Sequence, residues 1–151
     1  MKVRFLFASC LGVIILSSCS KSDNRSGTFA TGTLIGVDPC TARYSENKNR
    51  GFVIKYEYTD VTSGANITDT AITYNLPDVF DIPKELFPPR IIDYLFPEEY
   101  RNKYRFEFTF TQIPSSELVI LLCPGDMYAA PMYAATEGLQ IRIGRRFKIL
   151  P

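Results

Sequence analysis

The residues in this chain that could carry chemistry are its cysteines and its acidic side chains, because the 151-residue sequence contains no histidine. The absence of histidine excludes Ser-His-Asp and Cys-His catalysis and the usual zinc sites. Cys40 and Cys123 do not stand at a metal-type spacing, and the chain has no glycine-rich loop of the kind that cradles phosphate. We therefore expect no metal ion and no cofactor, and catalysis would depend on carboxylates.

Two acidic pairs are candidates for such catalysis, Glu98 with Glu99 and Asp78 with Asp81. Paired carboxylates can hydrolyse glycosides. Both pairs, however, stand beside prolines in polar segments, where Asp and Glu commonly occupy solvated turns. We therefore interpret them as turn residues and predict that the protein is not an enzyme, with a carboxylate-based glycoside hydrolase as the weaker alternative.

The first 18 residues have the order of an export signal. A basic start at Lys2 and Arg4 precedes an apolar run over residues 5–16, and two small serines follow. The run of about 12 residues is too short for a membrane-spanning helix, which needs about 20 apolar residues. The pattern therefore predicts a cleaved signal peptide.

The sequence Leu16-Ser17-Ser18-Cys19 resembles the lipobox of bacterial lipoproteins, with an aliphatic residue and two small residues before a cysteine. The resemblance implies cleavage before Cys19, lipid on its sulfur and acylation of the new amino terminus. Several acyl chains anchor a protein stably, so the membrane would be a partner through Cys19. The domain order would then be a signal peptide at 1–18, a lipidated cysteine with a polar tether at 19–27, and one domain at 28–151.

The segment after Cys19 is similar to that of small envelope lipoproteins of Gram-negative gut anaerobes, in which serine, lysine and acidic residues follow the cysteine. The resemblance implies an outer-membrane location. In that group an acidic tract can direct the protein to the cell surface, whereas here only Lys21 and Asp23 carry charge near the cysteine. The periplasmic face and the cell surface both stay open.

Loss of the signal peptide changes the sign of the net charge. The full chain has 17 basic and 16 acidic residues, and removal of Lys2 and Arg4 leaves 15 against 16, a net charge of −1. Such a chain lacks the positive field that nucleic acids or anionic membranes select, so no nucleic-acid partner is expected. Arg142 and Arg146 are interpreted as charges that protect a surface or edge strand, and they stay candidates for ligand contact.

Two cysteines remain after Cys10 is removed with the signal and Cys19 is lipidated. An even count in an oxidising compartment predicts a disulfide between Cys40 and Cys123. This bond would close a loop of about 80 residues and contribute on the order of 4 kcal/mol to stability. Two buried free thiols are the alternative, because sequence spacing does not prove proximity.

Tyrosines are the best candidates for a non-catalytic binding surface, because aromatic side chains are enriched at interfaces. We single out Tyr44, Tyr128 and Tyr133, of which the last two stand in a repeated Met-Tyr-Ala-Ala segment. Tyr56 and Tyr58, by contrast, are interpreted as core residues, because alternation along a strand most often reports burial.

Thr70 is a candidate for modification. The sequence Asp69-Thr70-Ala71 resembles the acid–hydroxyl–apolar motif that gut anaerobes use for O-glycosylation of exported proteins. The resemblance implies a glycan on Thr70, and an ordinary polar strand residue is the alternative.

The hydrophobic pattern that must position these residues predicts a mainly β domain. Six strands are expected at residues 28–37, 52–59, 67–76, 104–111, 118–123 and 139–150, with a short helix over Pro88–Phe96 and a loop over 124–138. Three strands, a helix and further strands is the order of OB-type barrels. An antiparallel six-strand barrel is therefore predicted, with a two-sheet sandwich as the alternative.

The sequence as a whole predicts an exported, lipid-anchored envelope protein. Its β domain would act as a non-catalytic binding or scaffolding module for a glycan or a protein. A structural assembly component with no soluble ligand is the alternative.

Overall fold

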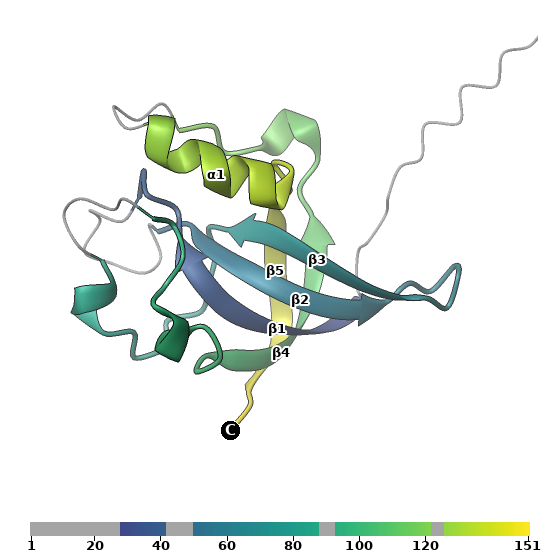
Figure 1. Cartoon of the computed structure of the whole chain (residues 1–151). Helices are drawn as coiled ribbons and strands as arrows, with labels where there is room; N and C mark the ends of the chain where they lie inside the picture. The colour runs from purple at the N-terminus through teal and green to yellow at the C-terminus, as the bar shows by residue number, and fades with distance from the viewer. Residues whose placement is uncertain (1–27, 42–49, 88–92, 122–125) are drawn as a thin grey trace, which may run out of the picture.

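The computed structural model describes residues 28–41, 50–87, 93–121 and 126–151. They form one antiparallel sheet of five strands in the order β3-β2-β1-β4-β5 (Figure 1). The strands are β1 (Thr28–Val37), β2 (Phe52–Thr59), β3 (Asn66–Thr73), β4 (Arg105–Gln112) and β5 (Ile141–Ile149). The one described α-helix, α1 (Asp126–Thr136), stands between β4 and β5 in the chain. The prediction of a mainly β, antiparallel domain is confirmed.

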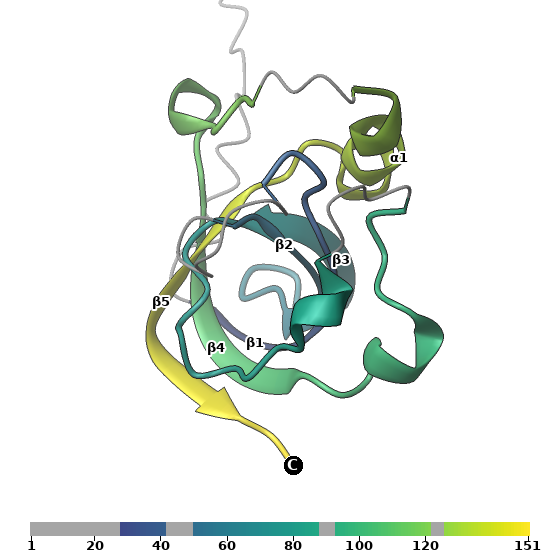
Figure 2. The same ribbon diagram turned by 90° about the vertical axis from the view of Figure 1, so that its left-hand side faces the viewer.

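The sheet curls strongly, yet it stays open because its two edge strands meet at one end only (Figure 2). Ile72 of β3 forms an isolated parallel bridge with Gln140, and the Ile72 N–H donates to the Leu139 C=O at 2.9 Å. The Asn75 side chain donates to the Ile143 C=O at 2.8 Å and accepts from the Ile143 N–H at 2.9 Å. We call this contact between β3 and β5 the edge seam.

The closed six-strand barrel and the two-sheet sandwich are both wrong, since the described strands are five and form a single open sheet. The missing strand is the one predicted over residues 118–123. Its described part, residues 118–121, is irregular, and the side chains of Val119 and Ile120 are 37% and 78% exposed. An apolar run does not by itself create a strand, because a strand also needs a neighbouring edge with free backbone groups.

The helix predicted over Pro88–Phe96 is wrong where the chain is described, and its residues before 93 lie outside the described part. The Val37 N–H donates to the Tyr94 C=O at 2.9 Å, and the Phe96 N–H donates to the Ile35 C=O at 2.8 Å. The pairing of β1 with β4 stops before these positions. The segment therefore satisfies backbone groups of β1 that would otherwise be buried without partners.

A helix, α1, occupies most of the region predicted as a loop over residues 124–138. Pro131 in the helix interior removes one intrahelical hydrogen bond, which lowers the helix propensity of this segment. Burial compensates for this loss, because Ala129 and Met132 pack against Val53 and Ile72 on the outer face of the sheet. Within the described ranges, no helix has the length and apolar character needed to cross a membrane.

The main core lies on the inner, concave face of the sheet and is strongly aromatic. Tyr56 and Tyr58 of β2 are buried there, which confirms their interpretation as core residues. The Tyr56 and Phe110 rings meet edge to face with centroids 5.1 Å apart, a favourable geometry for aromatic pairs. Gly36 permits the close approach of the segment around Tyr94 to β1, since a Cβ at position 36 would stand 2.1 Å from the Tyr94 carbonyl oxygen.

Candidate functional site

A polar cleft opens where β3 diverges from the start of β5. Its volume is about 530 Å³, and its walls come from β3, from the end of β4 and from the turn that follows α1. The edge seam closes one end of it, at Ile72 and Leu139. We call this hollow the edge cleft, and it is the candidate functional site.

The β3 wall presents backbone groups as well as side chains. Thr68 and Thr70 lie four and two residues before Ile72, so their backbone groups point in the same direction as those of Ile72, whose N–H is used in the edge seam. Their N–H and C=O groups therefore face away from β2 and toward the cleft. Asp69 lies on the opposite, inner side of β3, where its Oδ2 accepts a hydrogen bond from the Tyr58 hydroxyl at 3.2 Å.

The opposite wall is the C-terminal end of α1, which stops in a strained turn. The Gly138 N–H donates to the Tyr133 C=O at 3.2 Å, and the Glu137 N–H donates to the Ala134 C=O at 3.4 Å. This is the Schellman pattern of helix ends. Glu137 has φ 50°, a left-handed conformation in which glycine is preferred and other residues cost about 1 kcal/mol. Glu137 is therefore among the residues that line the cleft despite this cost.

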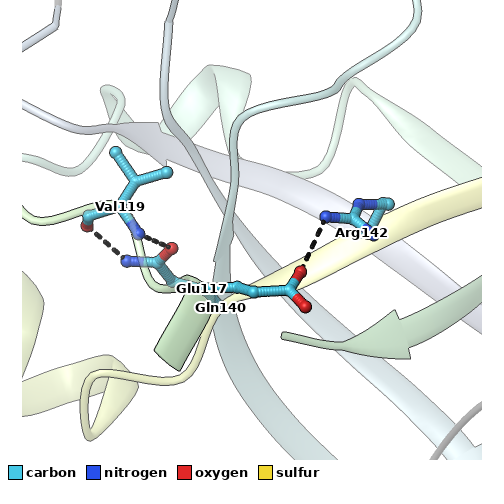
Figure 3. Close-up of polar contacts among 4 residues, drawn as sticks. All are labelled: Glu117, Val119, Gln140 and Arg142. Atoms are coloured by element: carbon cyan, nitrogen blue, oxygen red, sulfur yellow. Dashed lines mark hydrogen bonds and ion pairs between the residues drawn. The ribbon is translucent and has the colours of Figure 1, made fainter. Parts of the chain in front are cut away.

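Gln140 joins the cleft to the exposed apolar segment 118–121 (Figure 3). Its side chain is only 3% exposed, its Oε1 accepts from the Val119 N–H at 2.9 Å and its Nε2 donates to the Val119 C=O at 2.7 Å. The Gln140 side-chain amide thus forms, with the Val119 backbone, the pair of hydrogen bonds that a neighbouring strand would otherwise form. The nearby ion pair between Arg142 and Glu117, at 3.4 Å, is exposed and contributes about 1 kcal/mol or less.

Gln112, at the end of β4, is among the residues that line the cleft. Its Oε1 is buried and has no hydrogen-bond partner among the described residues. Because this oxygen has almost no accessible surface, a ligand in the cleft could reach it only after a side-chain movement.

The charge of the edge cleft limits what it can bind. Among its lining residues the charged side chains are Asp69 and Glu137, which are both acidic. Hydroxyls and amides make up most of the remaining polar lining, and Ile113 and Leu118 add apolar contacts. Negatively charged ligands would be repelled, whereas a neutral ligand rich in hydroxyl groups would find acceptors and donors.

A second hollow, of about 480 Å³, lies over the outer face of β1 and β2. Charges of both signs line it, among them Lys55, Glu57 and Glu98. These side chains are exposed, and none of its lining residues is held in a strained conformation. We therefore prefer the edge cleft.

A buried polar cluster lies apart from both hollows, beside Cys40. Asp38 is fully buried, its Oδ1 accepts from the Cys40 N–H at 2.9 Å and its Oδ2 accepts from the Tyr74 hydroxyl at 2.8 Å. Burial raises the pKa of Asp38, and these two hydrogen bonds oppose the rise. The pKa of Tyr74 is also raised, by burial and then by the negative charge of Asp38. Both Asp38 oxygens have partners, so the cluster holds the chain together rather than binding a ligand.

The structure brings few of the predicted ligand contacts to the cleft. Thr70 lines it, whereas Tyr133 is half-buried against the cluster beneath α1. Arg142 and Arg146 are exposed along β5. Tyr44 lies outside the described residues, and Tyr128 lies in α1 with its side chain outside the described part.

The predicted cysteine roles fall largely outside the described chain. Cys40 is buried and disulfide-bonded. Its predicted partner Cys123 and the predicted lipidation site Cys19 both lie outside the described residues. The specific Cys40–Cys123 pairing therefore stays a prediction. In the described ranges no three His, Cys, Asp or Glu side chains gather as a metal-ligand set.

The acidic pairs that the sequence offered for catalysis are exposed, which agrees with their interpretation as turn residues. Sequence reasoning missed Gln112, Glu137 and Gln140 as cleft residues. The signal for Glu137 was its position before Gly138, a pairing typical of helix ends, but the helix itself was not recognised. No family model, no curated protein and no solved structure matches this chain.

Proposed function

We propose that the protein is an exported lipoprotein, anchored to the outer membrane through lipid on Cys19, whose β domain binds a neutral glycan in the edge cleft without cleaving it. The observation that carries the glycan assignment is the edge cleft itself, a hollow of about 530 Å³ with hydroxyl, amide and carboxylate groups and no lining cation. The lipobox-like sequence before Cys19 supports the anchor.

The chemistry of the cleft matches that of sugar hydroxyls, which both donate and accept hydrogen bonds. Sugar hydroxyls can donate to the exposed Glu137 carboxylate. The Thr70 hydroxyl can donate to a sugar oxygen, and Ile113 and Leu118 can contact the C–H faces of the ring. A curved, partly open five-stranded sheet is also the architecture of OB-type domains, which bind oligosaccharides or oligonucleotides, although here α1 stands between the fourth and fifth strands.

The test is binding of neutral oligosaccharides to the full-length protein in detergent, with two variants at one position. Glu137→Ala removes the carboxylate and keeps the strained backbone, whereas Glu137→Gly removes both. Both variants should weaken binding by roughly ten- to a hundredfold, because hydrogen bonds to charged groups contribute about 1.5–3 kcal/mol. Only Glu137→Gly should raise the free energy of unfolding, by about 1 kcal/mol.

Calorimetric titration and urea denaturation measure these two effects separately. Glu107→Ala is the matched control, since Glu107 is an exposed acid on β4 and does not line the cleft. Its binding should equal that of the wild type. Failure of every oligosaccharide in a broad neutral panel to bind, or unchanged affinity in Glu137→Ala, would contradict the proposal.

Hydrolysis is the second candidate function, because Asp69 and Glu137 are both among the lining residues and paired carboxylates cleave glycosides. The Asp69 carboxylate, however, faces the inner side of β3 and accepts a hydrogen bond from Tyr58. Chromatography of bound oligosaccharides after long incubation distinguishes the two. We expect intact ligand. If the wild type released shorter sugars, and both Asp69→Asn and Glu137→Gln lost this activity, the protein would be a glycoside hydrolase and not only a binding protein.

The anchor is tested by mass spectrometry of the mature protein purified from cell envelopes. Lipid on an amino-terminal Cys19 is expected, and Cys19→Ser should stop processing before that residue. Protease shaving of intact cells then separates the periplasmic face from the cell surface. A mature chain with an unmodified Cys19 would contradict the anchor and leave the glycan proposal to its own test.

A further inference from the structure

A row of cations follows the outer edge of β5. Arg142, Arg145, Arg146 and Lys148 are all exposed, and β5 is an edge strand paired with β4 alone among the described strands. Figure 2 shows β5 along the outside of the curved sheet. We propose that this row, which we call the basic stripe, docks on the anionic headgroups of the bilayer that holds the anchor. The inference rests on the proposed lipid anchor.

An exposed aromatic side chain accompanies the cations. Phe29 is 54% exposed, and the Arg146 guanidinium carbon lies 5.5 Å from the centre of its ring. Cations beside exposed apolar groups suit a membrane interface, where the charge meets phosphate and the apolar group reaches the acyl boundary.

The basic stripe stands beside the point where the tether joins the sheet. The predicted tether ends at residue 27, and the pairs Thr28↔Phe110 and Phe29↔Thr109 join the start of β1 to β4. The next strand beyond β4 is β5. Eight tether residues reach about 30 Å when fully extended. The electrostatic potential of the bilayer decays within about 8 Å at physiological salt. The anchor keeps the stripe near the bilayer, so a small movement of the domain brings the stripe within this distance.

The charge around the stripe is complementary to an anionic surface. The stripe carries four cations against two neighbouring acids, Glu117, which forms an ion pair with Arg142, and Glu107, which stands opposite Lys148. The mature chain as a whole is predicted to carry −1. A soluble polyanion would meet the same charge, but the bilayer is the polyanion that the anchor brings within reach. Each Lys or Arg near such a surface strengthens docking by roughly fivefold.

Lysine acylation read out by mass spectrometry tests the docking in the full-length protein. The protein is reconstituted in vesicles of phosphatidylglycerol and phosphatidylethanolamine, or in neutral phosphatidylcholine vesicles. Lys148 reports on the stripe, and exposed Lys55 on β2 is the internal control. We expect acylation of Lys148 to be several-fold slower on the anionic vesicles, and that of Lys55 to be equal on both.

Two variants with equal loss of charge separate the stripe from net charge. Arg145→Gln/Arg146→Gln should weaken docking by roughly 25-fold, at fivefold per cation, and restore the acylation of Lys148. Lys84→Gln/Lys103→Gln, at exposed sites outside the stripe, should leave Lys148 protected. High salt should remove the protection in the wild type, because the screening length falls to about 3 Å at 1 M.

Three results would overturn the proposal. The first is equal acylation of Lys148 on the two kinds of vesicle. The second is equal loss of protection in both double variants. The third is that dextran sulfate, added to the protein in neutral detergent, protects Lys148 as well as the anionic bilayer does. Flotation is measured in parallel: a chain that does not float with vesicles overturns both anchor and docking, whereas a floating chain with an unprotected Lys148 overturns docking alone.

Discussion

Asp38 is a fully buried carboxylate whose two oxygens are both used in hydrogen bonds. It fixes the turn at Cys40, and the same turn is held to the start of β2 because the Asp38 N–H donates to the Gly51 C=O at 2.7 Å. Burial raises its pKa, which means that the folded protein favours the neutral acid. The residue therefore links folding stability to pH.

Replacement of Asp38 by asparagine should remove this link. Because the folded pKa lies above the unfolded value of 3.8, the contribution of Asp38 to stability is fully present below pH 3.8 and is lost as the pH rises through the folded pKa. Urea denaturation over this range should show the wild type losing stability relative to Asp38→Asn as pH rises. Parallel pH curves for the two proteins would contradict the prediction.

Single polar residues were the hardest to interpret from the sequence. Gln140 stands on the polar side of a predicted strand, a position typical of a solvated side chain, yet it is buried because its amide satisfies the backbone of Val119. Gln112 lines the same cleft as Gln140 and Leu118. Such roles arise from chain segments that meet only in the folded protein, and no spacing in the sequence reports them.

At the scale of elements, alternation was a reliable guide. The strands β1 and β2 match their predicted bounds. Clear alternation marked β2, and β-branched residues with interspersed glycines marked β1. The pattern failed for the run at 118–121 and for α1. In both places apolar residues without alternation fit more than one structure, and the surrounding sheet decides between them.

The attachment of α1 depends on Met132, which is fully buried between the helix and the outer face of β2 and β3. Met132→Ala should lower the free energy of unfolding by about 2–5 kcal/mol, the usual range for such a cavity. Met132→Leu, which conserves volume, should cost less than about 1.5 kcal/mol. Urea denaturation measures both variants, and equal stability of the two would show that Met132 is not packed as described.

At the scale of the whole molecule, sheet order could not be read from the sequence. Strands β1 and β2 are neighbours in sequence and in space, but β1 also pairs with β4, which follows it by about 75 residues in the chain. The edge cleft forms because of this order, since it leaves β3 and β5 as the two edges. The candidate site was therefore unpredictable until the topology was known.

The disulfide at Cys40 should matter most at this scale. If Cys123 is its partner, as the sequence predicts, reduction opens a loop of about 80 residues and lowers stability on the order of 4 kcal/mol. Thermal denaturation with and without reductant measures the effect, and Cys40→Ser should show no further loss on reduction. Two free thiols in the mature protein, found by mass spectrometry, would contradict the pairing.

The central place of β1 has a consequence for how the chain is made. Its two neighbours are β2 and β4, and the edge seam needs residues near the C-terminus, so a partly synthesised chain cannot complete the core. Sheets built from such distant partners fold slowly compared with local structures. A chain of this topology cannot complete its core until β4 and β5 have been synthesised.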